Sequence, residues 1–332
     1  MTKLVQKPAS NDAPNGVSGP VRDSAVSRWL LKWHLPPSLR RGIPQPFAVW
    51  LRRTRAELVS GRLPRDQDFS LTPEDVSASA AMSVVIPIHD APAVTRRCLA
   101  SLERYAPEAE IILVDDASRL SETSQIISDF GNRRGWRIVR HEKSQGHSRA
   151  CEAGARFATR PYLCLLNSDT VVTPWVWRLV KSAFQQDPAI GVAGPSTSSS
   201  GNEQRLETAS TLCTYWSDDQ ICAFAQTLLH GSHQPALCDL PWASGFALFI
   251  KIDLWRELGG FDLSLPDYGN ERELCLRVAQ RGHRIVWVRN AYIHHFGQQS
   301  YGTQIGMKGI RARCRNAMSY IGLKTRSGTG AC

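Results

Sequence analysis

Short apolar runs and amphipathic stretches alternate regularly between residues 83 and 170. Because strands that alternate with helices are joined by crossover connections, this pattern predicts an α/β fold with a doubly wound, mostly parallel sheet. Open sheets of this kind bind ligands at the carboxyl ends of their strands. We expect strands at 83–88, 110–114, 136–139 and 162–166, and helices at 93–105, 121–130 and 148–158.

Carboxylates directly follow two of these apolar runs. Asp115 and Asp116 come after the second run, and Asn167-Ser168-Asp169 comes after the fourth. A carboxylate at such a strand end could hold a divalent cation, Mg²⁺ or Mn²⁺, and the cation could hold a diphosphate. The alternative is an ordinary turn, since Asn, Ser and Asp all favour turns.

From residue 171 to residue 302 the alternation is less regular, and we expect a smaller α+β portion. The apolar stretch 242–250 has strand character, whereas 194–204 is a polar loop. The patterns predict helices at 175–186, 254–260 and 271–280, and strands at 190–193, 284–288 and 291–295.

The two ends of the chain differ from this central region in composition. Residues 1–23 are rich in Pro, Gly, Ser and Asn, which predicts a disordered tail. Residues 24–81 form a basic, Trp-rich extension, with two short helices expected within 24–66 and a polar linker at 67–81. Residues 303–332 are expected to form a basic helix and tail. The helices within 24–66 either lie on a membrane surface or pack on protein.

Charge and cysteine usage limit the classes of function. The net charge is +10, yet residues 1–80 carry 12 Lys and Arg against 7 Asp and Glu, and residues 301–332 carry 6 basic residues and no acid. A nucleic-acid binder more often carries its charge on the folded domain, so we expect no nucleic-acid partner. The nine cysteines form no C-x-x-C pair, and no apolar signal core follows the amino terminus. These features favour a cytoplasmic protein, with peripheral contact at the inner face of the membrane through residues 24–66.

Seven segments together resemble the family 2 glycosyltransferases of the GT-A fold, in the right order and spacing. They are VVIPIHD (84–90), VDDAS (114–118), LLNSDT (165–170), GPSTSSSGNE (194–203), SGFALFIKIDLWRELGGFD (244–262), NERELCLRVAQRG (270–282) and AYIHHFGQQSYG (291–302). The resemblance, closest to a rhamnosyltransferase-like branch, implies a domain at 82–302. Its nucleotide half would be 82–170 and its acceptor half 171–302. It implies inverting transfer of a sugar from a UDP- or dTDP-sugar to a hydroxyl of a glycan or lipid-linked acceptor.

The resemblance also implies roles for residues of the donor side. The nucleotide pocket would be lined by Pro87, Ile88, His89, Asp115 and Asp116. Gly146, Asn167 and Ser168 would also contact the donor, and Asp169 with His295 would hold the cation. Successive residues of a strand face opposite ways, so His294 would point away from the site.

Glu271 matches the acid that acts as general base in the family, although the usual residue there is Asp. It would take the proton of the acceptor hydroxyl as that oxygen attacks the anomeric carbon. Glu273 is the alternative base, or it forms an i,i+4 pair with Arg277. Trp242, Gly245 and Asn270 would lie on the acceptor side.

The sequence departs from the family pattern at several positions. Asn167 replaces the first acid of a D-x-D motif, and Ser144 and Glu152 replace two asparagines of an N-x-G-x₅-N-x-G segment. The Asp-Tyr-Gly turn at 267–269 replaces a more aromatic entry to the acceptor site. These changes leave room for a non-catalytic nucleotide-sugar-binding or scaffold domain. A nucleotidyltransferase is disfavoured, because HDAPAV (89–94) is not a Gly-rich phosphate loop and has no Lys or Arg.

Overall fold

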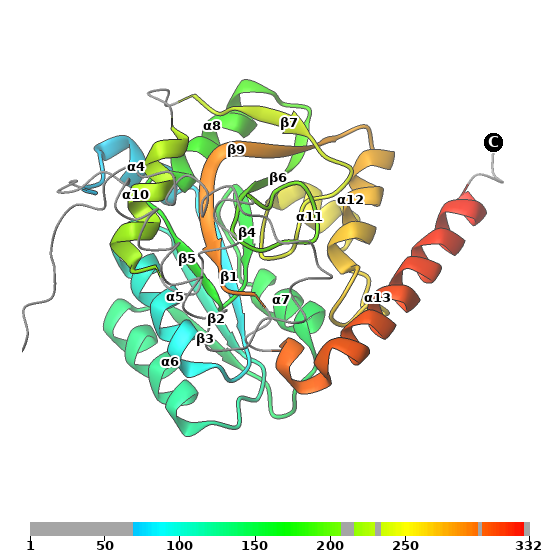
Figure 1. The fold of residues 1–332 in the computed structure, drawn as a ribbon, viewed down its shortest axis with the longest axis horizontal. Helices are drawn as coiled ribbons and strands as arrows, with labels where there is room; N and C mark the ends of the chain where they lie inside the picture. The colour runs from blue at the N-terminus through cyan, green and yellow to red at the C-terminus, as the bar shows by residue number, and fades with distance from the viewer. Residues whose placement is uncertain (1–68, 207–215, 230–233, 298–300, 329–332) are drawn as a thin grey trace, which may run out of the picture. The chain divides into compact units, whose positions relative to one another are not determined.

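The computed structural model describes residues 69–206, 216–229, 234–297 and 301–328 (Figure 1). All of them belong to the larger of two compact units, Leu63–Cys332. The tail expected at 1–23 and the helices expected within 24–66 lie outside the described residues.

A nine-stranded sheet forms the centre of this unit, with the order β3-β2-β1-β4-β8-β6-β9-β5 and with β7 paired to β9. Strands β1 to β4 are parallel, whereas β8 runs antiparallel between β4 and β6. Strands β6 and β9 are parallel again, and β5 and β7 are antiparallel to β9. The strands are β1 (Met82–Ile88), β2 (Glu110–Asp115), β3 (Arg137–Arg140), β4 (Tyr162–Leu166), β5 (Thr170–Val172), β6 (Ile190–Ser196), β7 (Leu237–Asp239), β8 (Ala247–Lys251) and β9 (Arg284–His295).

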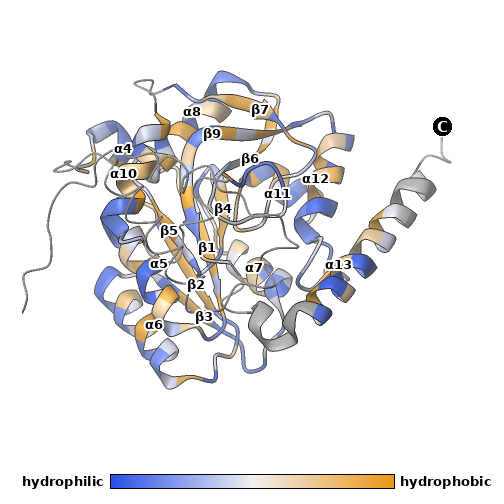
Figure 2. Cartoon of the chain, in the orientation of Figure 1, coloured by the Kyte–Doolittle hydropathy of each residue, from blue (hydrophilic) through white to orange (hydrophobic). Residues whose placement is uncertain are grey.

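Helices pack against the sheet along its length, and the expected α/β GT-A-like fold is confirmed. The strands appear as a hydrophobic centre in Figure 2, because their side chains are buried toward both faces. The helices are α4 (Pro73–Ser79), α5 (Pro92–Tyr105), α6 (Ser121–Arg134), α7 (His147–Ala155), α8 (Val176–Gln186), α10 (Asp218–Leu228), α11 (Ile252–Leu258), α12 (Asn270–Gln280) and α13 (Tyr301–Gly328).

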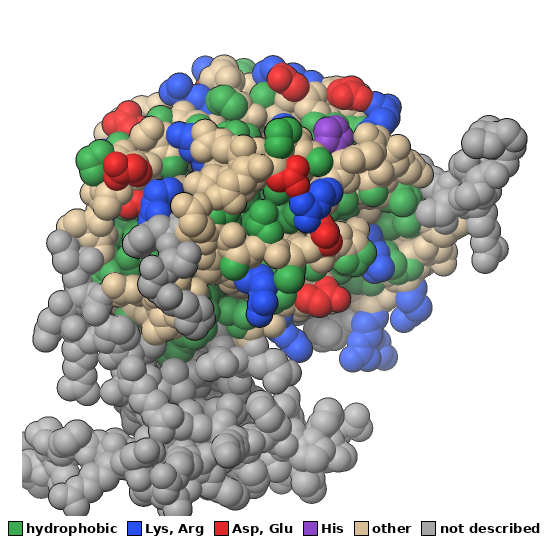
Figure 3. All heavy atoms as spheres, turned by 90° about the horizontal axis from the view of Figure 1, so that it is seen from above, with side chains coloured by type: hydrophobic (Ala, Val, Ile, Leu, Met, Phe, Trp, Pro, Cys, Tyr) green, Lys and Arg blue, Asp and Glu red, His purple; other side chains and the backbone are tan. Residues whose placement is uncertain are grey.

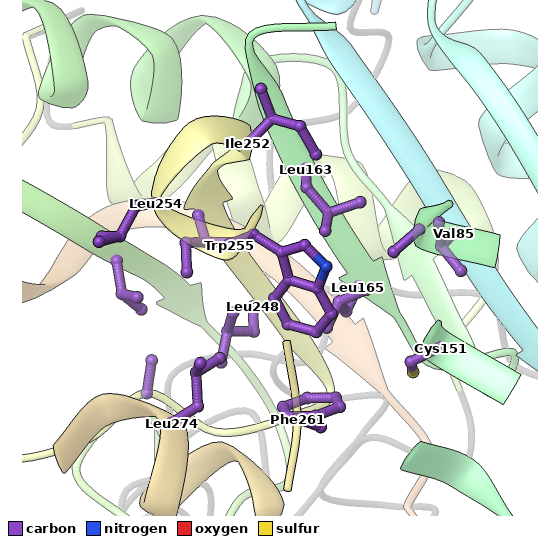
Figure 4. Close-up of a cluster of buried hydrophobic side chains, with 14 of the residues drawn as sticks. Val85, Cys151, Leu163, Leu165, Leu248, Ile252, Leu254, Trp255, Phe261 and Leu274 are labelled. Carbon is purple, nitrogen blue, oxygen red and sulfur yellow. The ribbon is translucent and has the colours of Figure 1, made fainter. Parts of the chain in front are cut away.

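One hydrophobic cluster holds α7, α11 and α12 against the sheet, and it fixes the helices that border the strand ends (Figure 4). Trp255 and Phe261 meet edge to face with ring centroids 5.1 Å apart, and both are buried. Leu274 of α12 belongs to the same cluster. Burial of each such side chain contributes about 1.5–3 kcal/mol, so the position of α12 is strongly specified.

The structure corrects three sequence expectations. The polar linker expected at 67–81 contains α4, whose N-terminal Thr72 and Asp75 form a capping box. Residues 242–246 are not strand, because β8 begins at Ala247. The two strands expected at 284–288 and 291–295 are one continuous strand, β9.

Two further observations concern the surface of the described residues. No helix among them is long and apolar enough to cross a bilayer. On the face shown in Figure 3, acidic and basic side chains are interspersed, as expected for the near-neutral central region.

Candidate active site

The pairing of β5 with β9 brings together two residues that are far apart in the sequence, Asp169 and His295. Thr170 lies opposite His295 in the antiparallel register, and the backbone N–H of Phe296 donates to the carbonyl of Asp169 at 2.9 Å. As a result, His295 Nε2 lies 3.2 Å from Asp169 Oδ1. His294 points the other way, is buried, and pairs through Nδ1 with the Tyr292 hydroxyl at 2.9 Å.

The His295 ring is held in one orientation. Its Nδ1 lies 2.7 Å from the carbonyl oxygen of Ser199, which can only accept, so Nδ1 carries a proton. The ring of Phe246 stacks on it at a centroid distance of 5.4 Å. Burial lowers the pKa of His295, but the Asp169 carboxylate and the Ser199 carbonyl raise it by more. The Nε2 atom therefore faces a carboxylate, and this arrangement favours a cation between the two side chains.

The residues present fit a divalent cation, although they supply few ligands. Among the described residues there is no group of three or more His, Cys, Asp and Glu side chains suited to a metal. The pair of Asp169 and His295 nevertheless has the outer hydrogen bond that metal-ligating histidines usually make, from the far ring nitrogen to a carbonyl. The hydroxyl of Ser168 is buried at the same place and has no hydrogen-bond partner among the described residues. A cation here would need oxygen ligands from a substrate.

Glu271 lies in the first turn of α12 and lines the same cavity. The helix begins after Gly269, whose φ of +83° favours glycine. Residue 245 is also glycine, and a Cβ there would lie 3.5 Å from Glu271 Cδ, so the carboxylate is approached closely by backbone. Burial raises the pKa of the Glu271 carboxyl, while its own backbone N–H and Arg272 lower it by less.

Glu273, the alternative base, is buried and enclosed. Arg277 donates to it through Nε at 2.9–3.0 Å and through Nη2 at 2.6 Å. The same guanidinium also donates to the carbonyls of Leu258 and Gly260. The i,i+4 pair is therefore present, and Glu273 is part of the structural support of α12.

The cavity between these groups contains eight of the residues that the sequence singled out, and it omits six. Those that line it are Pro87, Asn167, Ser168, Asp169, Gly245, Asn270, Glu271 and His295. Those that do not are Ile88, His89, Asp115, Asp116, Gly146 and Trp242.

Asp116 and the residues around it are engaged with protein rather than with the cavity. Asp116 is fully buried and accepts hydrogen bonds from the Ser144 hydroxyl and from the backbone N–H groups of Gln145 and Gly146, at 2.8–3.0 Å. His141 Nδ1 lies 2.7 Å from Asp116 Oδ1, the oxygen that also accepts from Gln145. These donors lower the pKa of Asp116 although burial raises it.

The neighbours of Asp116 are enclosed in the same way. Asp115 accepts from the backbone N–H of Ser118 at 2.8 Å and pairs with Arg140 at 3.1 Å. His89 is buried, and its Nδ1 lies 2.7 Å from the carbonyl of Asp116. Ile88 is a core residue.

The departures from the family pattern have structural roles in this chain. Ser144 donates to Asp116, and Glu152 accepts a 2.6 Å hydrogen bond from the backbone N–H of Phe261.

Gly146 has φ +88° and precedes α7, and its N–H donates to Asp116. Trp242 lies outside the cavity and stacks against Arg272, with the guanidinium carbon 5.3 Å from the ring centroid.

Five cavity residues carried no expectation of a role: His147, Ser244, Phe246, Asp267 and Tyr268. His147 follows the glycine of a segment that the sequence did single out, and Ser244 adjoins Gly245. Asp267 accepts a 3.4 Å hydrogen bond from the backbone N–H of His147 and pairs with Arg313 of α13. The pattern of the sequence marked this turn as a departure, but it did not indicate that its side chains reach the cavity.

Comparisons with known proteins show what this chain is similar to. Residues 83–238 match the family model described as glycosyl transferase family 2. An uncharacterized protein of Sinorhizobium fredii is 24% identical over 250 residues, which are 72% of this chain and 27% of that protein. The poly-beta-1,6-N-acetyl-D-glucosamine synthase of Staphylococcus epidermidis is 31% identical over 85 residues, covering 26% of this chain and 20% of that protein. The chain thus spans about a quarter of the length of these curated relatives.

A solved structure shares the fold across most of the chain. The crystal structure of GalNAc-T7 with UDP, GalNAc and Mn²⁺ superposes with a TM-score of 0.51 and 17% identity, covering 87% of this chain and 56% of that chain. Together with the sheet topology, this similarity shows a fold of the GT-A kind, and residues 83–238 are similar to glycosyl transferase family 2.

Proposed function

We propose that this protein is an inverting glycosyltransferase that moves a sugar from a nucleotide-diphosphate donor to a hydroxyl of a glycan or lipid-linked acceptor. One observation carries the proposal: a single cavity is lined both by the Asp169–His295 pair and by Glu271. Displacement at an anomeric carbon needs both a site for the leaving diphosphate and a base for the incoming hydroxyl. The donor is proposed to be a UDP- or dTDP-sugar.

The donor side is assigned to Asp169 and His295. When bound by these two side chains, Mg²⁺ or Mn²⁺ would neutralise the negative charge that develops on the departing nucleoside diphosphate. Asn167 and Ser168 lie beside them with polar groups that suit the oxygens of a donor. Because the protein supplies one carboxylate and one imidazole, we expect the diphosphate to complete the cation's coordination.

The acceptor side is assigned to Glu271. Its carboxylate accepts the proton of the acceptor hydroxyl as that oxygen forms a bond to the anomeric carbon, and the bond from this carbon to the diphosphate oxygen breaks. Attack from the face opposite the leaving group inverts the anomeric centre. The raised pKa of Glu271 makes it a stronger base than an exposed carboxylate.

Two compared proteins support a sugar nucleotide as donor and a growing glycan as acceptor. GalNAc-T7 was crystallised with UDP, GalNAc and Mn²⁺, and the Staphylococcus epidermidis relative is named for synthesis of a polysaccharide. We infer that the chain works in polysaccharide biosynthesis at the cell envelope, from the cytoplasmic side. Residues 24–66 would contact the membrane. If they do, the full chain with Trp29→Ser and Trp33→Ser should co-sediment with vesicles less than the wild type does.

A nucleotide-sugar screen tests the proposed function. Thermal shift with Mn²⁺ identifies a donor, because a ligand that binds the native state raises its apparent stability. Release of the nucleoside diphosphate is then measured for the wild type and for Glu271→Gln, with and without glycan acceptors. Slow release by the wild type and much slower release by the variant support the proposal. Donor binding with equal release from both proteins would instead indicate a non-catalytic sugar-nucleotide-binding domain.

A further inference from the structure

His147 is a partly buried histidine that lines the cavity and that the proposed mechanism does not use. It is the first residue of α7, directly after the glycine that ends the loop held by Asp116. Its Nε2 lies 3.2 Å from Asn167 Oδ1, and its Nδ1 lies 3.4 Å from Asn270 Nδ2. One ring thus joins a residue beside Asp169 to the residue that precedes Glu271.

The contacts on the donor side fix which nitrogen of His147 carries a proton. The Ser199 carbonyl requires a proton on His295 Nδ1, and His295 Nε2 faces the Asp169 carboxylate at 3.2 Å. The amide nitrogen of Asn167 lies on this side, 3.5 Å from His295 Nε2. Its Oδ1 lies on the other side, 3.2 Å from His147 Nε2, and as an acceptor it requires a proton on that nitrogen.

The hydrogen bonds on the base side also determine which nitrogen of His147 carries a proton. The Ser148 hydroxyl donates to the carbonyl of Leu265, so its oxygen accepts the 2.8 Å hydrogen bond from Asn270 Nδ2. The same amide nitrogen faces His147 Nδ1, which must then be the unprotonated ring nitrogen. Both ends of the network therefore require the same neutral form of His147, protonated on Nε2.

We propose that His147 is a positioning residue for glycosyl transfer. It fixes the side-chain amides of Asn167 and Asn270, and it thereby holds the donor side and the base side in a fixed relative position. This inference rests on the proposed function. The inference adds to the proposed function a role for Asn167, which stands where the family pattern has an acid. Because His147 occupies Asn167 Oδ1, the amide offers N–H groups to the cavity, which suit a phosphate or hydroxyl oxygen of the donor and do not suit a cation.

The alternative is that His147 only fills space. Its ring lies 3.8–3.9 Å from Cys151 Sγ, and its centroid is 6.5 Å from that of Phe261, so packing contacts exist. Packing alone would be satisfied by leucine, whereas the network needs one donor and one acceptor about the width of an imidazole apart. Glutamine offers both groups on one amide, and it is the conservative replacement.

The first test reads the protonated nitrogen directly in the protein without ligands. Long-range ¹H–¹⁵N correlation spectra of the ¹⁵N-labelled protein distinguish the two neutral forms, and comparison with His147→Gln assigns the signals. We expect proton attachment at Nε2 of His147. Attachment at Nδ1 would overturn the proposal, because Asn270 Nδ2 and Asn167 Oδ1 would then both face the wrong kind of group. This result does not depend on any glycosyltransferase activity.

The second test measures binding of UDP in the presence of Mn²⁺ by titration calorimetry. We expect His147→Leu to weaken binding about tenfold, as for other residues that orient ligand-binding groups, and His147→Gln to stay within about threefold of wild type. Cys151→Ala removes the contact between the ring and Cys151 Sγ and leaves Asn167 and Asn270 in place, and it should bind UDP as the wild type does. Equal losses in His147→Leu and Cys151→Ala would support mere packing and overturn the proposal.

A double-mutant cycle completes the test by asking whether His147 acts through Asn167. The Asn167→Ala variant has no amide for His147 to orient, so adding His147→Leu should cause little further loss of UDP binding. Additive losses would show that His147 acts independently of Asn167 and would contradict the proposal. If the wild type binds no nucleotide at all, the proposed donor class fails, and the spectroscopic test still decides the role of His147.

Discussion

The ends of β2 and β4 look alike in the sequence but lie in different environments in the structure. Each is a buried apolar strand with a carboxylate just beyond its carboxyl end, Asp116 directly after β2 and Asp169 three residues after the last residue of β4. Asp116 is surrounded by donors from residues 141–146, so its oxygens are occupied by protein. Asp169 lines a cavity and faces His295. The loop that returns to each strand end decides whether its carboxylate is enclosed by protein or lines the cavity.

The first turn of α12 repeats this contrast within three residues. Glu273 is enclosed by Arg277, whereas Glu271 lines the cavity. Two residues along a helix correspond to about 200° of rotation, so neighbouring acids of one motif face different surroundings. We therefore separate enclosed carboxylates, Asp116 and Glu273, from cavity carboxylates, Asp169 and Glu271. Enclosed carboxylates should matter for stability and cavity carboxylates for activity.

The largest expected effect comes from Glu271→Gln, which keeps the shape of the side chain and removes the base. Sugar transfer should fall about 10³-fold, because general-base catalysis commonly contributes 10²–10⁴-fold. Binding of the donor should change little. The matched control is Asp253→Asn, an acid-to-amide change at a side chain that is 95% exposed. Transfer rates are measured by release of nucleoside diphosphate, and a near-normal rate in Glu271→Gln would remove Glu271 from the mechanism.

The next largest effect is on stability and comes from Asp116→Asn. An amide has one acceptor oxygen and places an N–H₂ group against donors, so donors that surround this buried side chain lose their acceptor. We expect the free energy of unfolding to fall by about 3 kcal/mol, as when one partner of a buried pair is removed. Urea denaturation gives this value. A loss below about 1 kcal/mol would mean that the loop at 144–146 relaxes around the change, and the enclosed class would lose its best example.

A smaller effect is expected from Asp169→Asn, the same substitution at the cavity carboxylate. Mn²⁺-dependent binding of a nucleoside diphosphate should weaken about tenfold, since carboxylates bind this cation better than amides. The free energy of unfolding should fall less than in Asp116→Asn. Titration calorimetry with and without Mn²⁺ separates the cation-dependent part of binding. Unchanged cation dependence would argue against Asp169 as a ligand, and an unfolding loss as large as that of Asp116→Asn would end the distinction between the two classes.

The sequence predicted the parallel half of the sheet well, because each strand there is a continuous apolar run between amphipathic helices. It did not predict β5, since Thr-Val-Val at 170–172 is too short to stand out. Yet the pairing of β5 with β9 is what places Asp169 beside His295. Helix α4 was missed although its signal is local, a Thr-Pro-Glu-Asp start that forms a capping box.

The candidate site was predicted where one residue and its own motif suffice, and not where distant segments supply the partners. Glu271 and Asp169 could be chosen from their motifs, and both line the cavity. Asp116 was expected to line the nucleotide pocket as well. Its enclosure depends on where the loop at 141–146 returns, which no local pattern reveals. His147 was overlooked for a related reason, because its partners come from β4 and α12.

The smallest expected effect is a dependence on pH that separates Glu271 from ordinary carboxylates. Burial raises the pKa of Glu271, and only the ionised form accepts a proton, so the acid limb of the transfer rate should lie above the ordinary glutamate range. A carboxyl with a raised pKa binds more protons in the folded chain than in the unfolded chain. Its contribution to stability is therefore present at low pH and is lost as pH rises through that window. The difference in unfolding free energy between Glu271→Gln and wild type should accordingly grow with pH and then level off. Asp253→Asn should show no such trend, and a flat difference for Glu271→Gln would mean that its carboxylate is as well solvated as an exposed one.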